Sequence, residues 1–145
     1  MAMTVDFAGL EEIEKMLLQN AEAAEKYAEP ILREGIKVMI KAQNASLSKF
    51  IKSGSEGKLR NSAGTKAINK SQSGISATVF PQGTQLHGND RKGKRTKVRN
   101  VTIGAVMEFG TSTQPARPWL SEAEELAADA VNDAMGAEWE RVSNG

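Results

Sequence analysis

The chain has 145 residues, a net charge of +1 and no cysteine. A chain of this length is expected to form a single domain, residues 1–145, with a core of its own. Without cysteine, disulfides and thiolate zinc sites are excluded, which fits folding in a reducing cytoplasm. The first six residues show no signal-peptide pattern, and no apolar run approaches the ~18 residues of a membrane span. No membrane partner is therefore expected.

Two helices are expected in the N-terminal third. Asp6 is a suitable N-cap, and apolar residues at 10, 13 and 17 follow at helical spacing. Pro30 is expected to begin a second helix, because proline is tolerated in the first turn. The apolar stripe of this second helix should be the main core element. Its residues are Leu32, Ile36, Met39, Gln43, Leu47 and Phe50.

The middle of the chain predicts a small sheet. Residues 53–64 are rich in Ser, Gly and charge, and they indicate a loop. Residues 65–68 and 75–80 indicate two strands joined by a turn, and residues 101–103 indicate a third short strand. Val106, Met107 and Phe109 are apolar but too closely spaced to decide between a strand and a short helix.

The last helix is expected to begin at Pro118 or within one turn of it, since Ser121 and Glu124 have capping-box spacing. One face of this helix holds mostly small residues, which would let the long second helix approach closely. The expected fold class is α+β: two N-terminal helices, a small antiparallel sheet of about three strands, and a C-terminal helix packed on the sheet.

Residues 82–99 form a polar, basic segment that is expected to be a flexible loop. Three interpretations stay open for it: a solvated hairpin tip, an arm that docks on an acidic protein surface, or a nucleic-acid contact. Nucleic-acid binding would use the charges to neutralise phosphates, but no aromatic residue is interleaved to stack on bases. The basic residues are Arg91, Lys92, Lys94, Arg95, Lys97 and Arg99.

The sequence predicts no catalytic, cofactor or metal site. His87 is the only histidine, so a histidine-based metal site or a conventional triad cannot be built. Residues 54–58 superficially resemble a phosphate loop, but the glycine spacing fails and Leu59 follows the lysine. The chain is therefore expected not to be an enzyme and to need no cofactor.

The most unusual stretch is residues 107–120, which hold two prolines, a glycine, two large aromatics and an opposed Glu/Arg pair. We interpret it as a rigid joint before the last helix, because glycine can adopt a positive φ and proline fixes φ. The Glu/Arg pair is expected to brace the turn within one chain, with an inter-subunit pair as the alternative. Both aromatics are expected in the core. The joint residues are Glu108, Phe109, Gly110, Pro115, Arg117, Pro118 and Trp119.

Residues 108–120 read Glu-Phe-Gly-Thr, a polar spacer, Pro-Ala-Arg-Pro, an aromatic and Leu. This pattern resembles the signature of the phage head–tail joining family, small tail-completion or neck proteins of long-tailed bacteriophages. The chain has Trp119 where members of the family usually have Phe, and Ala105 and Val106 where an aromatic is usual. Three weaker matches extend the resemblance over most of the chain, at residues 7–13, 57–62 and 74–79.

The resemblance implies a structural virion protein that completes the tail and joins it to the head around the DNA channel. It implies a homo-oligomeric ring, sixfold as the first expectation, made in the bacterial cytoplasm and located in the virion neck. The implied partners are other neck and tail proteins, while genome DNA would pass through the lumen without sequence-specific binding. A ring needs heterologous contacts, expected at the sheet edges, the basic loop and the C-terminal end. The alternative is a small nucleic-acid-binding module that acts through residues 91–99.

Overall fold

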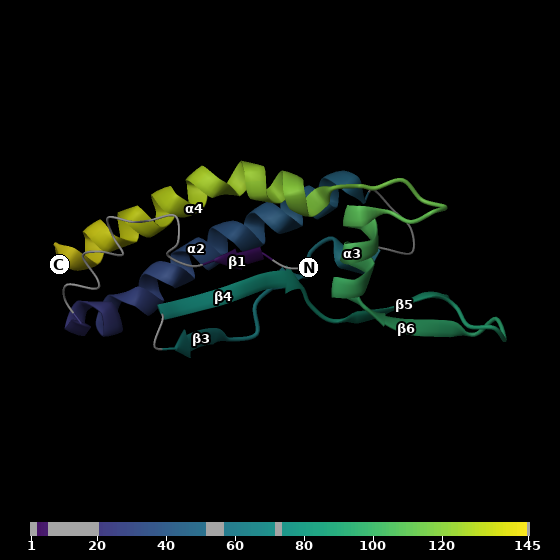
Figure 1. Cartoon of the computed structure of the whole chain (residues 1–145), viewed down its shortest axis with the longest axis horizontal. Helices are drawn as coiled ribbons and strands as arrows, with labels where there is room; N and C mark the ends of the chain where they lie inside the picture. The colour runs from purple at the N-terminus through teal and green to yellow at the C-terminus, as the bar shows by residue number, and fades with distance from the viewer. Residues whose placement is uncertain (1–2, 6–20, 52–56, 72–73, 145) are drawn as a thin grey trace.

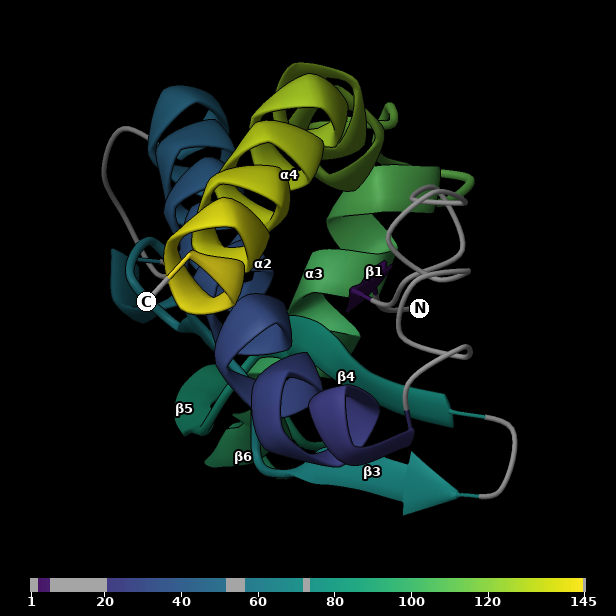
Figure 2. The same ribbon diagram turned by 90° about the vertical axis from the view of Figure 1, so that its left-hand side faces the viewer.

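The computed structural model describes residues 3–5, 21–51, 57–71 and 74–144. Two long helices lie side by side, and one of them covers a small sheet (Figure 1). These helices are α2 (Ala21–Phe50) and α4 (Trp119–Ser143). Seen from the end, α4 lies on α2 and α2 lies on the sheet (Figure 2). The α+β class is confirmed. Only one helix, α2, lies in the described N-terminal part of the chain, and the helix expected after Asp6 falls outside it.

Helix α2 is the main core element, as its apolar stripe predicts. Every residue of the stripe is buried except Phe50, which is half-buried. The predicted start at Pro30 is wrong, because α2 begins at Ala21 and continues through the proline. A proline inside a helix costs about 3 kcal/mol or more. Burial of the neighbouring Ile31 and Leu32 side chains offsets part of that cost.

A four-stranded antiparallel sheet is built around β4 (Gly74–Pro81). β4 pairs with β1 (Met3–Val5) on one side and with β3 (Ile68–Ser71) and β2 (Ala63–Gly64) on the other. The predicted strand at 75–80 is confirmed. The strand predicted at 65–68 begins only at its last residue and continues to 71, because its register is set by pairing with β4.

The two faces of β4 are used differently. Ala77 and Val79 are fully buried toward α2, where the Gln43 side-chain amide donates a hydrogen bond to the Val79 carbonyl at 2.9 Å. Thr78 and Phe80 point to the opposite face by the two-residue period of a strand, and both are half-buried. One face of the sheet therefore belongs to the core and the other stays open to solvent.

Two segments fold differently from their prediction. Residues 82–99, expected as a flexible loop, contain the antiparallel hairpin of β5 (Thr84–Asn89) and β6 (Arg95–Arg99). Residues 101–103, expected as a strand, belong to helix α3 (Asn100–Phe109). The helix places Ile103 and Met107, four residues apart, on one face and buries both. A short apolar run does not by itself distinguish these two structures.

The segment expected as a loop at 53–64 also holds core structure. It contains the short 3-10 helix η1 (Gly57–Leu59) and strand β2, and the Leu59 side chain is fully buried. The hydroxyl of Ser62 and the backbone amide of the same residue bond to the Leu59 carbonyl, at 2.6 and 3.2 Å. This turn holds the leucine against the core.

Helix α4 begins at Trp119, in agreement with the predicted start. The prediction that it packs on the sheet is wrong, since α4 packs along α2. Its contact face carries small residues, including Ala123 and Ala127, which let the two helix backbones approach closely. Near the N-terminus of α4, the Ser46 hydroxyl donates to the Trp119 carbonyl at 2.5 Å, and Lys49 forms an ion pair with Glu122.

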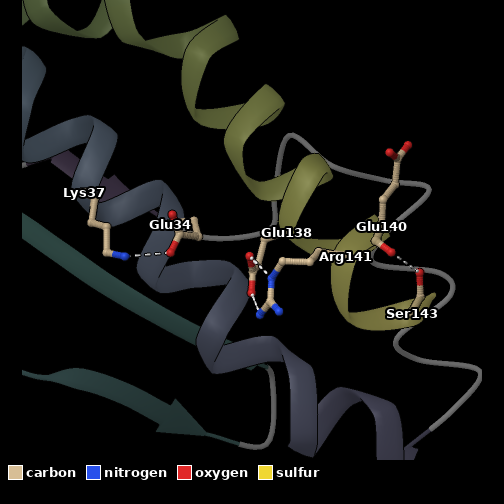
Figure 3. A network of polar contacts seen from close by, with 6 residues as sticks. All are labelled: Glu34, Lys37, Glu138, Glu140, Arg141 and Ser143. Carbon is tan, nitrogen blue, oxygen red and sulfur yellow. Dashed lines mark hydrogen bonds and ion pairs between the residues drawn. The ribbon is translucent and has the colours of Figure 1, made fainter. Parts of the chain in front are cut away.

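The far end of the α2–α4 contact carries alternating charges (Figure 3). On α4, Arg141 donates to Glu138 in a bidentate pair at 2.6 and 2.9 Å, and on α2, Lys37 pairs with Glu34 at 2.7 Å. The hydrogen bond from Arg141, assisted by the positive charge of Lys37, lowers the pKa of Glu138. Within the described ranges, no helix combines the length and apolar composition needed to cross a membrane.

Candidate functional site

The joint between α3 and α4 is built around the Glu108 carboxylate. Glu108 is buried, and its two oxygens accept hydrogen bonds from the backbone amides of Leu120, at 2.8 Å, and Ser121, at 3.3 Å. The Ser121 hydroxyl donates to the same carboxylate. These amides belong to the first turn of α4, where backbone donors have no partner within the helix. Glu108 therefore caps α4 with a negative charge at the positive end of its dipole.

Arg117 was expected to pair with Glu108. Arg117 is half-buried, and its backbone amide donates a hydrogen bond to the Met107 carbonyl at 2.6 Å. The carboxylate contacts just described are with α4, so capping is a role of Glu108 that the sequence reading missed. The serine at 121 was the available signal, because capping serines and acidic side chains gather at helix starts. The ion pair itself stays a prediction.

Gly110 has the positive φ that the sequence predicts, +73°, with ψ at −178°. A Cβ at this position would lie 2.7 Å from the Ala116 amide nitrogen and 2.9 Å from the Gln114 carbonyl oxygen. The chain therefore turns so tightly after α3 that backbone occupies the space of a side chain. Pro115 and Pro118 are exposed and lie on the return of this turn, after the bend at residues 112–114 and before α4.

The two aromatics of the joint have opposite environments. Trp119 is fully buried, as predicted, and its indole N–H donates to the Gly104 carbonyl at 2.8 Å. The ring lies so close to α3 that a Cβ on Gly104 would be 2.9 Å from its Cζ2. Phe109 was predicted to be in the core, but its side chain is 74% exposed. Two residues after Met107 on a helix, Phe109 points away from the buried face.

The basic residues lie on the β5–β6 hairpin, which projects beyond the end of the sheet, away from the C-terminus (Figure 1). All six basic side chains are exposed. Asp90 shapes the turn: its carboxylate accepts the backbone amides of Lys92, at 2.8 Å, and Lys94, at 2.9 Å. Gly93 supplies a φ of +79° in the same turn. The acidic residue of the hairpin is thus engaged with its backbone, and six positive charges remain at the surface.

The hairpin has an inner and an outer face. On the inner face, Gln85 is buried and donates to the Asn100 side chain at 2.8 Å, while Val98 packs against the core. The outer face carries Arg95, Lys97 and Arg99, because side chains alternate along a strand. Three of the six predicted cations therefore form one row, and Arg91, Lys92 and Lys94 lie at the turn.

A groove of about 490 Å³ lies on the open side of the sheet, next to the base of the hairpin. Its lining includes Lys66, Arg99, the half-buried Phe80, Thr65 and Thr78. The Thr65 hydroxyl oxygen is buried without a hydrogen-bond partner. The sequence does not reveal this groove, because its lining comes from segments that are distant along the chain and meet only in the folded molecule.

In the part of the chain that the structure describes, no three His, Cys, Asp or Glu residues come together in a way that could hold a metal ion. The sole histidine, His87, is half-buried on β5. A scan against models of protein families, a search of curated proteins and a search of solved structures each found no match for this chain. The candidate functional features are the joint, as a structural element, and the hairpin, as a charged surface.

Proposed function

We propose that this protein is a structural component of a bacteriophage neck, which assembles as a ring, completes the tail and joins it to the head around the DNA channel. The observation that carries the proposal is the joint. Residues 108–120 carry the family resemblance, and the structure uses them for architecture: Glu108 caps α4, Gly110 makes the turn, and Trp119 fills the core. Such a motif preserves the angle between two helices, and a ring subunit needs a fixed shape.

The hairpin supports the same proposal. A rigid body with one exposed, charged arm is suited to bind neighbours, because the arm can make contacts without altering the core. Its charges fit an acidic protein surface on a neighbouring subunit or on a tail protein. In this function the energy comes from buried surface and complementary charge, and no chemical step is required.

The test is electron microscopy of the purified protein, alone and mixed with tail tubes of the phage that encodes it. We expect rings, or a density added to one end of the tube, with a sixfold ring as the first expectation. Reversing two charges of the hairpin, Lys94→Glu with Arg95→Glu, should leave the fold intact and reduce the fraction of tubes carrying this density. Reversing two exposed lysines of α2, Lys26→Glu with Lys41→Glu, is the matched control. Failure of the wild-type protein to form rings or to bind tubes would contradict the proposal.

A second candidate function is duplex DNA binding through the hairpin, favoured by its six exposed cations. If these side chains contacted phosphates, affinity would fall about a thousandfold between roughly 50 and 200 mM salt. Submicromolar binding with such a slope, lost when residues 91–99 are neutralised, would favour this function over the structural one. Weak binding that changes little with salt would exclude it.

A further inference from the structure

The solvent face of α4 carries a row of carboxylates whose mutual repulsion destabilises the helix. Glu125, Asp129 and Asp133 are all exposed and follow one another at four-residue intervals. Side chains four residues apart are neighbours on a helix, and like charges at this spacing repel. Among the described residues, the ion pairs of α4 use Glu122 and Glu138, and none of them involves this row.

An exposed leucine lies beside this acidic row. Leu126 is 68% exposed and lies within one helical turn of both Glu125 and Asp129. We name the surface formed by Glu125, Leu126, Asp129 and Asp133 the acidic face of α4. A leucine among charges at the surface adds nothing to the core, but in an interface it would be covered.

The outer face of the hairpin has the complementary composition. It carries Arg95, Lys97 and Arg99 in one row on β6. Leu86 on β5 is the direct cross-strand partner of Lys97, so it lies on the same face, and it is 54% exposed. We name the surface formed by these four residues the basic face of the hairpin.

The two rows also match in spacing. Alternate residues of a strand repeat every ~6.6 Å, because each residue advances the chain by about 3.3 Å. Residues four apart on a helix repeat every ~6 Å, because each residue rises about 1.5 Å. Three cations and three carboxylates can therefore face one another in register over a length of about 12–13 Å. In that register Leu86 is level with the middle cation, Lys97, and Leu126 lies about 4.5 Å along the helix axis from the middle carboxylate, Asp129, so both leucines fall within the contact.

We propose that the basic face of the hairpin of one subunit docks on the acidic face of α4 of a second copy of this chain. The inference rests on the proposed ring and names the contact that would close it. The contact joins two different faces, because contact between two identical faces would oppose like charges, and such a heterologous contact can close a ring. The partner is a second copy and not DNA, since the same chain supplies both complementary faces and the acidic face would repel a phosphate backbone.

The absence of cysteine from the chain allows a direct test of the pairing. Two variants, Leu86→Cys and Leu126→Cys, are purified separately, mixed in low salt and oxidised mildly. We expect the 86–126 disulfide dimer to exceed either homodimer at least tenfold. Replacing Leu126→Cys by Glu124→Cys, on another exposed side of α4, should abolish the excess. Homodimers in equal amount, or no 86–126 product, would overturn the proposal.

Charge exchange gives an independent test by sedimentation velocity. Lys97→Glu and Asp129→Lys should each weaken self-association at least tenfold, because each opposes like charges. The double variant, which exchanges the charges within one interface, should recover most of the wild-type association. Glu124→Lys changes the same charge on α4 outside the acidic face and should have little effect. A double variant as weak as the single variants, or single variants that associate like wild type, would contradict the pairing.

These results separate the pairing from the proposed function. Rings that attach to tail tubes without forming the 86–126 disulfide would sink the pairing and leave the neck function standing. Disulfide-linked oligomers that never attach to tail tubes would support the pairing and count against the neck function.

Discussion

At the scale of single residues, the joint depends on the side chains of Glu108 and Trp119 and on a glycine, Gly110, where no side chain would fit. Glu108 satisfies backbone donors at the start of α4, Trp119 bonds to the Gly104 carbonyl, and Gly110 leaves room for the returning backbone. The side chains of Glu108 and Trp119 make hydrogen bonds that link α3 to α4, and a side chain at position 110 would meet the backbone of residues 114 and 116. The dense motif in the sequence therefore corresponds to a set of specific contacts.

We predict that Gly110→Ala strongly destabilises the fold. The conformation at Gly110 is almost exclusive to glycine and costs another residue about 1–3 kcal/mol, and the added Cβ would also meet backbone at 2.7 Å. Gly93→Ala is the matched control, because Gly93 has a φ of +79° with nothing within 4 Å of a Cβ. Urea unfolding should show the larger loss for Gly110→Ala. Equal losses for both variants would show that the close approach has no cost.

We predict that Glu108→Gln lowers the free energy of unfolding by about 1–3 kcal/mol, the usual cost of a lost charged hydrogen bond at a buried site. The amide cannot accept with both ends, so one of the α4 donors near the carboxylate loses its partner. Glu124→Gln, exposed on the same helix, should change the free energy by less than about 0.5 kcal/mol. Unfolding curves that coincide for the two variants would argue against capping by Glu108.

At the scale of elements, α2 organises the molecule through contacts on two sides. Its buried stripe meets α4 and β4, and an exposed ion-pair cluster joins it to the sheet at β3. There the Glu29 carboxylate pairs with Lys70 of β3 at 2.9 Å and with Arg33 of α2 at 2.5 Å. The hydrogen bond from Lys70, followed by that from Arg33, lowers the pKa of Glu29 below its usual value of 4.5.

This lowered pKa predicts an acid-dependent contribution of Glu29 to stability. Because the pKa is lower in the folded state, the stabilisation is present above the usual pKa and is lost as the pH falls through the folded one. Glu29→Gln should therefore lower the melting temperature slightly at pH 7, and the difference from wild type should close at strongly acidic pH. Lys70→Met should show the same trend. A difference that persists unchanged into acid would contradict the assignment.

At the scale of the whole molecule, the helices and the four-stranded sheet form a body, and the β5–β6 hairpin forms an arm that projects from it. The core lies between α4, α2 and the inner face of the sheet, while the hairpin joins this core through Gln85 and Val98. The exposed charges of the arm lie outside the core. Charges on α4 likewise lie opposite its buried face. The surface can therefore be specialised for binding while the body stays constant.

We predict that the hairpin can be shortened without loss of the fold. Residues 87–96 are replaced by Asn-Gly, which joins the directly paired Leu86 and Lys97 by a two-residue turn. The melting temperature should change little, because Gln85 and Val98 are retained. Gln85→Ala, which removes a buried hydrogen bond, should cost about 1–3 kcal/mol. If the shortened variant unfolds as easily as Gln85→Ala, the tip contributes to the body.

The elements whose pattern repeats along the chain can be predicted from the amino-acid sequence alone. The stripe of α2 spans five turns, the face of α4 begins after Pro118, and β4 alternates over most of its length. Such periodic segments bury one side whatever they pack against, so their pattern is readable without partners. The six cations and the joint residues were also found, since composition alone marks them.

The conformation and orientation of the short segments depend on contacts with residues distant in the sequence. The segment 101–109 is too short for its apolar period to distinguish a helix from a strand. In the folded protein it is helical, and Gly104 of this helix packs against the Trp119 ring. The hairpin needs cross-strand pairs distant in sequence, which alone define its basic face. The exposure of Phe109, the packing of α4 on α2 and the alignment of charge rows all depend on three-dimensional neighbours. The local sequence pattern does not specify these neighbours, because tertiary contacts depend on which buried surfaces pack together.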